Sequence, residues 1–153
     1  MGILKTKTYM GIIIEPEIRA LLTKDAINGY PDECCGFLFG EEDDQESRRI
    51  LEIGVVHNAK TGDKTRRFEI SPVDYMNAER YAIERKCKLL GVYHSHPNHP
   101  AIPSEHDRKA AQPYFSYVII SVMNSQIITI RSWRLNEQNE FVEEQILDYQ
   151  FTI

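Results

Sequence analysis

The chain has 153 residues, a net charge of −5, 42% hydrophobic residues and 27% charged residues. This length and balance suit a single globular domain over residues 1–153. The acidic charge argues against a nucleic-acid partner, which binds basic patches, and no apolar stretch approaches the roughly 18 residues of a membrane span, so we expect no membrane partner.

The number and spacing of the cysteines indicate the kind of cellular compartment. Cys34, Cys35 and Cys87 are odd in number, and two are adjacent, which is not the pattern of a disulfide framework. The apolar run at 11–14 is too short for the hydrophobic region of a secretory signal. We therefore expect a cytoplasmic protein in a reducing environment.

The first third of the chain predicts a strand, a helix and two further strands. Pro16 suits a first helical turn, and Gly29 suits the helix end. The apolar face of this helix has four members at helical spacing: Ile18, Leu21, Leu22 and Ala26. The strands are predicted at residues 10–14, 34–40 and 48–57, and the acidic segment 41–46 is predicted as a solvated turn.

Strands and helices continue to alternate in the rest of the chain, which is compatible with an α/β fold. Ser71 and Pro72 predict the start of a helix that runs to about Lys86. The other elements are predicted, in chain order, as a loop at 58–64, strands at 66–70 and 89–96, a short helix from Ser104 that stops before Pro113, a central strand at 115–123 buried on both faces, and a hairpin of strands at 126–135 and 141–151.

The clearest chemical signal is a histidine pair followed by an acid. His94 and His96 lie two residues apart on a predicted strand, so both side chains point to one face and can converge on one ion. Pro97 and two later prolines stiffen the loop that brings Asp107 back over the pair. Two imidazoles and a carboxylate suit zinc, and three protein ligands with an open fourth position are typical of catalytic zinc. The sequence therefore predicts a zinc hydrolase.

Each piece also has a simpler interpretation. Residues 104–107 are typical of a helix capping box with Ser104 as the N-cap, and a His-x-His pair often ends a surface strand. Glu33 can be a carboxylate at a strand start that pairs with a basic side chain. The metal site is favoured by the conjunction of both histidines, the proline-rich loop and the acid within fourteen residues.

Residues 94–107 resemble the JAMM motif of the MPN/Mov34/PAD-1 zinc metallopeptidases. The likeness rests on His-Ser-His-Pro at 94–97, seven positions between His96 and Ser104, and then Glu-His-Asp. The motif also needs an upstream glutamate, and Glu33, before Cys-Gly-x-Leu-x-Gly, resembles the segment that carries it. Asn58 and the segment 67–72 are weaker likenesses. The resemblance runs from about residue 33 to residue 123, without a departure in the core motif.

This resemblance implies a role for each residue. His94, His96 and Asp107 would bind about one zinc ion per chain, with a water of lowered pKa in the fourth position. Glu33 would stay off the metal, accept the water proton and pass it to the leaving amine. Ser104 would donate its hydroxyl to the tetrahedral oxyanion, a use that competes with its capping of the helix. No other cofactor is implied.

The resemblance also implies an α/β fold, in which helices flank a curved mixed β-sheet similar to that of the cytidine deaminases. It implies a small stand-alone peptidase of bacterial type. The substrate would be a peptide or isopeptide bond after the C-terminal Gly-Gly of a ubiquitin-like or sulfur-carrier protein. The oligomeric state stays open.

Two functions of other classes compete with this one. A zinc deaminase needs His-x-Glu and Pro-Cys-x-x-Cys, and neither is present. A non-catalytic MPN-type interaction scaffold remains the alternative, although such domains have usually lost ligands that this chain keeps. His99 and His106 lie near the motif without an assigned role, and Cys34 is interpreted as a buried, inert thiol.

Overall fold

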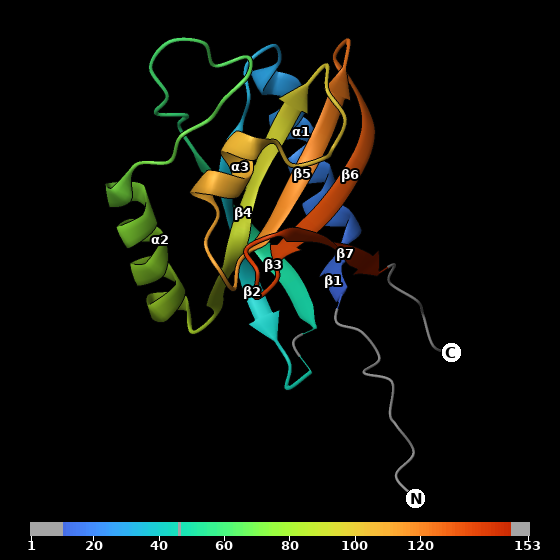
Figure 1. Ribbon diagram of the computed structural model, residues 1–153. Helices are drawn as coiled ribbons and strands as arrows, with labels where there is room; N and C mark the ends of the chain where they lie inside the picture. The colour runs from blue at the N-terminus through green and yellow to red at the C-terminus, as the bar shows by residue number, and fades with distance from the viewer. Residues whose placement is uncertain (1–10, 46, 148–153) are drawn as a thin grey trace, which may run out of the picture.

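The computed structural model describes residues 11–45 and 47–147, in which helices surround one mixed sheet (Figure 1). The helices of this part are α1 (Pro16–Gly29), α2 (Pro72–Arg85) and α3 (Glu105–Ala110). Its strands are β1 (Gly11–Ile14), β2 (Cys35–Glu42), β3 (Arg48–Val56), β4 (Lys88–Pro97), β5 (Ser116–Met123), β6 (Gln126–Leu135) and β7 (Phe141–Leu147). Within these ranges, no helix is both long enough and apolar enough to cross a membrane.

The sheet closes into a barrel. Its strand order is β1-β3-β2-β4-β5-β6-β7, and the short strand β1 pairs in parallel with both β3 and β7. β4 runs parallel to β5 and antiparallel to β2. The predicted mixed sheet with flanking helices is confirmed. Its closure is an additional finding, because the pairing of the first and last strands leaves no local sequence signal. The likeness to the cytidine deaminases stays a prediction.

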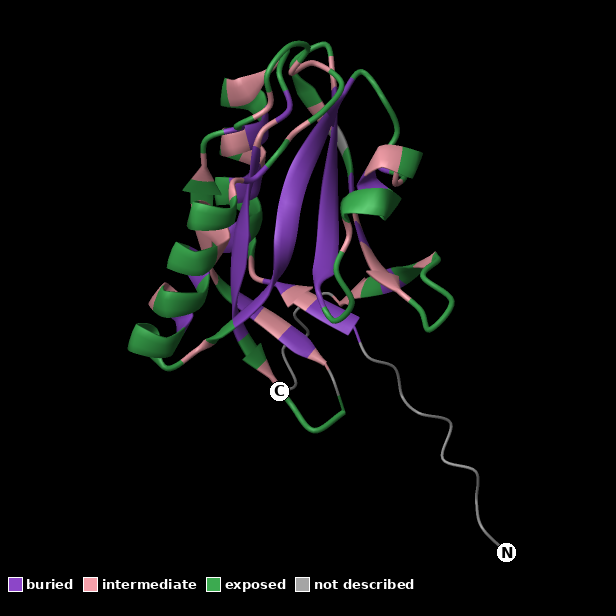
Figure 2. Ribbon diagram, turned by 60° about the vertical axis from the view of Figure 1, so that its left-hand side comes forward, coloured by how far each residue is buried: buried purple, intermediate pink, exposed green. Residues whose placement is uncertain are grey.

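The helices α1 and α2 pack against opposite faces of the sheet. Successive side chains of a strand point to opposite faces, so Leu38 of β2 joins Ile18 and Leu22 of α1 in one apolar cluster, whereas Phe37 joins Ala78 of α2 in the other. Fully burying one such large side chain contributes about 1.5–3 kcal/mol. The central strands are accordingly buried between exposed helix surfaces (Figure 2). β4 lies in this packed centre and is buried from its second residue to its last.

Most predicted elements are confirmed within two residues of their predicted bounds. The central strand, β5, is buried on both faces up to Met123, as expected. The prediction for Leu21 is wrong: it is 48% exposed, because α1 turns Ile18, Leu22 and Ala26 to the sheet and leaves Leu21 at the side. The closing hairpin is confirmed as far as Leu147. Its predicted residues 148–151, and residue 10 of the first strand, lie outside the described residues.

The strand predicted at 66–70 is also wrong. These residues form an irregular segment, although Phe68 and Ile70 alternate with polar neighbours as they would in a strand. Ile70 is buried in the α2 cluster, and Phe68 packs beside it. The segment's backbone bonds instead to the start of its own loop, where the Ala59 amide donates to the Glu69 carbonyl at 2.8 Å. The apolar alternation therefore reflects packing without a neighbouring strand.

Candidate metal centre and active site

The end of β4 carries two buried histidines side by side. Because His94 and His96 alternate with Ser95, both rings leave the strand on the same face. Their Nε2 atoms lie 3.1 Å apart. Ser95 points the other way, where its hydroxyl accepts the amide hydrogen of Cys34 at 2.8 Å. That bond ties the end of β4 to the start of β2.

Asp107 reaches the histidine pair from the first turn of α3. Its Oδ2 atom lies 3.0 Å from Nε2 of His96 and 3.3 Å from Nε2 of His94. The same oxygen accepts the Ser104 amide hydrogen at 2.9 Å, while Oγ of Ser104 accepts the Asp107 amide hydrogen at 3.0 Å. This reciprocal capping box begins the helix and orients the carboxylate.

The three donor atoms form a triangle of the size that a tetrahedral metal ion requires. Zinc bonds to nitrogen and oxygen of about 2.0–2.1 Å place neighbouring ligand atoms about 3.3 Å apart. The observed sides of 3.1, 3.0 and 3.3 Å are close to this value. The residues present therefore fit a zinc ion in both donor chemistry and spacing.

Burial and charge shift the pKa values of all three residues in this cluster. Burial lowers the pKa of His94, which favours the neutral ring. Burial also acts to lower the pKa of His96, but the hydrogen bonds to Asp107 and to the Pro100 carbonyl outweigh it, and that pKa is raised. Burial acts to raise the pKa of Asp107; the two histidines outweigh it and hold that pKa well below its ordinary range. Asp107 is therefore a carboxylate at any physiological pH.

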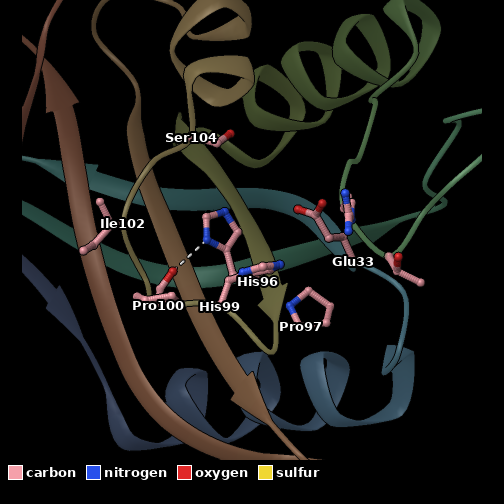
Figure 3. Close-up of a pocket in the computed structure, with 9 residues that line it drawn as sticks. Glu33, His96, Pro97, His99, Pro100, Ile102 and Ser104 are labelled. Atoms are coloured by element: carbon pink, nitrogen blue, oxygen red, sulfur yellow. Dashed lines mark hydrogen bonds between the residues drawn. The ribbon is translucent and has the colours of Figure 1, made fainter.

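The loop after β4 fixes the orientation of His96. Nδ1 of His96 lies 2.8 Å from the carbonyl oxygen of Pro100, so Nδ1 donates and the lone pair on Nε2 faces the cluster (Figure 3). Two side chains from neighbouring strands hold the loop. The Ser121 hydroxyl donates to the His99 carbonyl at 2.6 Å, and Nε1 of Trp133 donates to the Ala101 carbonyl at 3.0 Å. The ring of His94 stacks on Phe68, with centroids 4.4 Å apart.

Glu33 brings a second buried carboxyl to the histidines. It directly precedes Cys34 and β2, whose first residue, Cys35, pairs with His94. A carboxyl oxygen of Glu33 and a ring nitrogen of each histidine all lie within 4.8 Å of one another. Oδ2 of Asp107 lies 3.0 and 3.3 Å from the two Nε2 atoms, a spacing that fits a direct ligand. Burial raises the pKa of the Glu33 carboxyl to about 8, partly opposed by His96.

Two cavities open onto the cluster. The first, of about 440 Å³, is bounded by Glu33, His96 and Ser104; the Glu33 carboxyl points into it from the side opposite Ile102 (Figure 3). The second, of about 310 Å³, shares His94 and Asp107 with the cluster. The two cavities have no lining residue in common.

Comparison with known proteins places this geometry in a family. A family of prokaryotic homologs of the JAB domain matches residues 15–136, most of the chain. The chain belongs to this family. The desampylase of Pyrococcus furiosus is 27% identical over 136 residues, which cover 89% of each chain. A probable TtuB-protein conjugate cleaving protease of Thermus thermophilus is 34% identical over 104 residues, which cover 67% of this chain and 62% of that protein.

Solved structures of similar proteins share the fold of this prokaryotic JAB-domain protein. A Desulfitobacterium hafniense protein has a TM-score of 0.79 at 26% identity, covering 91% of this chain and 93% of its own. A Salinibacter ruber protein has a TM-score of 0.71 at 34% identity, covering 94% of both. A JAB1/MPN domain protein of Archaeoglobus fulgidus, at 18% identity and a TM-score of 0.53, covers 92% of this chain and 98% of its own and shows a likeness of fold alone.

In this JAB-domain chain the five residues singled out in the sequence meet at one place. Glu33, His94, His96, Ser104 and Asp107 all contact or line the donor cluster and its first cavity. The expected competition for the Ser104 hydroxyl does not arise. As a cap, Oγ only accepts a hydrogen bond, so its own hydrogen stays free to donate.

The other residues near the motif take different places. His99 is exposed and lines the first cavity, whereas His106 lines the second. Burial raises the pKa of the Cys34 thiol, which fits an inert cysteine. Sequence reasoning missed Thr65 and Arg66, which line the first cavity. No local pattern could have found them, because their approach to Glu33 depends on the path of a long irregular loop.

Proposed function

We propose that this chain is a zinc-dependent metallopeptidase that hydrolyses a peptide or isopeptide bond after the C-terminal Gly-Gly of a ubiquitin-like or sulfur-carrier protein. The observation that carries the proposal is the donor triangle of His94, His96 and Asp107 with the Glu33 carboxyl beside it. The substrate class is supported by two relatives: one is named for desampylation and the other for cleaving TtuB-protein conjugates.

His94, His96 and Asp107 would hold the zinc. Bound there, the ion would supply Lewis-acid chemistry, which lowers the pKa of a water and polarises the substrate carbonyl. The chain's contribution is to keep the two Nε2 lone pairs and the Asp107 carboxylate turned to one point. The Pro100 carbonyl does this for His96 and the Ser104 amide for Asp107.

Glu33 is the proposed general base and acid. In the metal-free protein, burial raises the pKa of the Glu33 carboxyl to about 8, so it binds a proton more readily than an ordinary glutamate. A buried carboxyl of this kind can accept a proton from water and pass it to a leaving amine. Glu33 lines the cavity in which the leaving group would lie. A base placed in this way typically contributes 10²–10⁴-fold to the rate.

Ser104 is the proposed donor to the oxyanion. Its Oγ accepts the Asp107 amide hydrogen, which orients the hydroxyl at the edge of the cavity and leaves its hydrogen free. A positioned donor of this kind is typically worth about 10²–10³ in kcat.

We place this enzyme in the cytoplasm as one domain. The three cysteines are free thiols, as expected in a reducing compartment.

The direct test is cleavage of a defined substrate. The zinc-loaded protein is incubated with a ubiquitin-like carrier that bears a C-terminal peptide extension after Gly-Gly, and with the same carrier joined to a lysine side chain. Mass spectrometry should locate a cut directly after the second glycine in at least one of them. Glu33→Gln serves as the control and should bind zinc without cutting. If the loaded protein cuts neither substrate, or if the variant cuts as fast as the wild type, the proposal fails.

A further inference from the structure

Asn58 is a buried residue whose side-chain amide makes all of its hydrogen bonds to backbone groups. It lies just beyond β3 and is 8% exposed. Its Nδ2 donates to the carbonyl of Glu33 at 3.2 Å and to the carbonyl of Arg67 at 3.0 Å. Its Oδ1 accepts the amide hydrogens of Lys60 and Glu69, each at 3.0 Å. An amide side chain offers two donors and one oxygen with two lone pairs, so every position is used.

These bonds connect Glu33 to one wall of the first cavity. This part of the wall belongs to the loop 57–71, which contains no helix or strand, so no regular hydrogen-bond ladder sets the path of the loop. The loop bonds to Glu33 a second time, because the Glu33 amide donates to the Lys64 carbonyl at 2.7 Å. Thr65 and Arg66, which follow Lys64, line the same cavity as Glu33.

The same loop supports a histidine of the donor cluster. Arg67 and Glu69, both bonded to Asn58, flank Phe68 in the sequence. The Phe68 ring stacks on His94 at an interplanar angle of 23°. One buried side chain therefore sets the position of the Glu33 backbone relative to both the cavity wall and the ring that backs His94.

We propose that Asn58 is a positioning residue, which fixes the backbone of Glu33 so that its carboxyl stays directed at the reacting bond. The inference rests on the proposed role of Glu33 as the base. Asn58 contacts neither the donor atoms nor the cavity, so it acts on turnover through Glu33. A displacement of about 1 Å in a catalytic group can cost 10²-fold in rate.

The first experiment is a double-mutant cycle on cleavage. Asn58→Ala should lower kcat by about 10–100-fold and leave KM and the zinc content unchanged. Glu33→Asp keeps a carboxyl on a side chain that is shorter by one methylene. Turnover should stay measurable, but the carboxyl no longer has the position that Asn58 is proposed to fix. In the Glu33→Asp background, Asn58→Ala should lower kcat by a much smaller factor than it does in the wild type. An equal loss in both backgrounds overturns the inference, because it means a general effect on the fold.

A second variant separates the bonds that Asn58 donates from the bonds that it accepts. Asn58→Asp keeps an oxygen for the amides of Lys60 and Glu69 but has no donor for the carbonyls of Glu33 and Arg67. It should lose kcat as Asn58→Ala does, and wild-type turnover in this variant would contradict the proposal. Asn136→Ala is the matched control, since Asn136 also accepts two backbone amides, those of Gln138 and Glu140, in the turn between β6 and β7. It should keep its kcat.

Amide hydrogen exchange on the metal-free protein tests the link without any turnover. Asn58→Ala should speed the exchange of the Glu33 amide as well as those of Lys60 and Glu69. If only the two loop amides exchange faster, Asn58 supports the loop alone and the inference is wrong. This measurement also separates the two proposals: a wild-type protein that cuts no substrate defeats the proposed function, whereas the exchange of the Glu33 amide still decides whether Asn58 holds it.

Discussion

The Nε2 atoms of His94 and His96 face each other at 3.1 Å in a buried site. Two ring lone pairs repel at this distance unless a proton or a cation lies between them. The Asp107 carboxylate, close to both nitrogens, adds the negative charge that attracts either one. Protons and metal ions should therefore compete for the same point, which links metal binding to pH.

Zinc binding should weaken as the pH falls through the His96 titration. In the metal-free protein the pKa of His96 is raised above 6.5, so a proton occupies the site at and below this pH and must leave when zinc binds. Calorimetric titration at pH 6 and pH 8, each in two buffers of different ionisation enthalpy, should show tighter binding at pH 8 and more protons released per zinc at pH 6. Equal affinity and no proton release at pH 6 would exclude both histidines as ligands.

Removing the Asp107 carboxylate should weaken zinc binding itself. Asp107→Ala deletes one of three donors, and we expect a loss beyond the 10–100-fold that is typical when a supporting contact of a ligand is removed. Competition with a chromogenic chelator gives the affinity. Ser104→Ala is the control, because it also breaks the capping box of α3 but leaves the carboxylate in place, and it should retain most of the zinc affinity. If both variants bind zinc equally weakly, the loss of affinity comes from the broken capping box and not from the missing carboxylate.

Ser104→Ala should lower kcat much more than it lowers stability. The lost cap costs about 1 kcal/mol, whereas a lost oxyanion donor costs about 10²–10³ in kcat. Ser71→Ala provides a matched comparison, because Oγ of Ser71 caps α2 in the same way, accepting the Asp74 amide at 3.2 Å. Both variants should unfold at similarly reduced denaturant concentrations, but only Ser104→Ala should have a reduced kcat. A normal kcat in Ser104→Ala would exclude Ser104 as a donor to the oxyanion.

The metal-free protein should lose stability with rising pH because of Glu33. Burial raises the pKa of Glu33 from 4.5 to about 8. The proton therefore stabilises the folded state fully below pH 4.5, and this contribution is lost as the pH rises through 8. Urea unfolding of the metal-free wild type and of Glu33→Gln at pH 5.5 and pH 8 should show the variant gaining relative stability at pH 8. The gain is at most about 1.4 kcal/mol per pH unit. Parallel pH dependences would show that Glu33 is an ordinary exposed acid.

Local signals in the sequence predicted most elements and the proximity of the candidate site residues. Alternation placed His94 and His96 on one face, and the Ser104 cap placed Asp107 on the first turn of α3. The sequence did not predict the closure of the barrel, because β1 and β7, which pair in parallel, lie far apart along the chain. The strand predicted at 66–70 failed for a related reason. Its alternating Phe68 and Ile70 pack onto the protein without a strand to pair with, and no sequence period reports whether a partner is present.

The helix α3 has an unusual anchor. Of its six residues only Asp107 is buried, so the helix has no apolar side chain beneath it. A helix this short has little stability of its own in water. The capping box and the charge of the histidine pair therefore hold it against the barrel. It follows that whatever occupies the space between the two rings also decides how firmly this turn of chain is ordered. A backbone probe on α3 would thus report the state of the metal centre from the outer surface of the protein, without any substrate present.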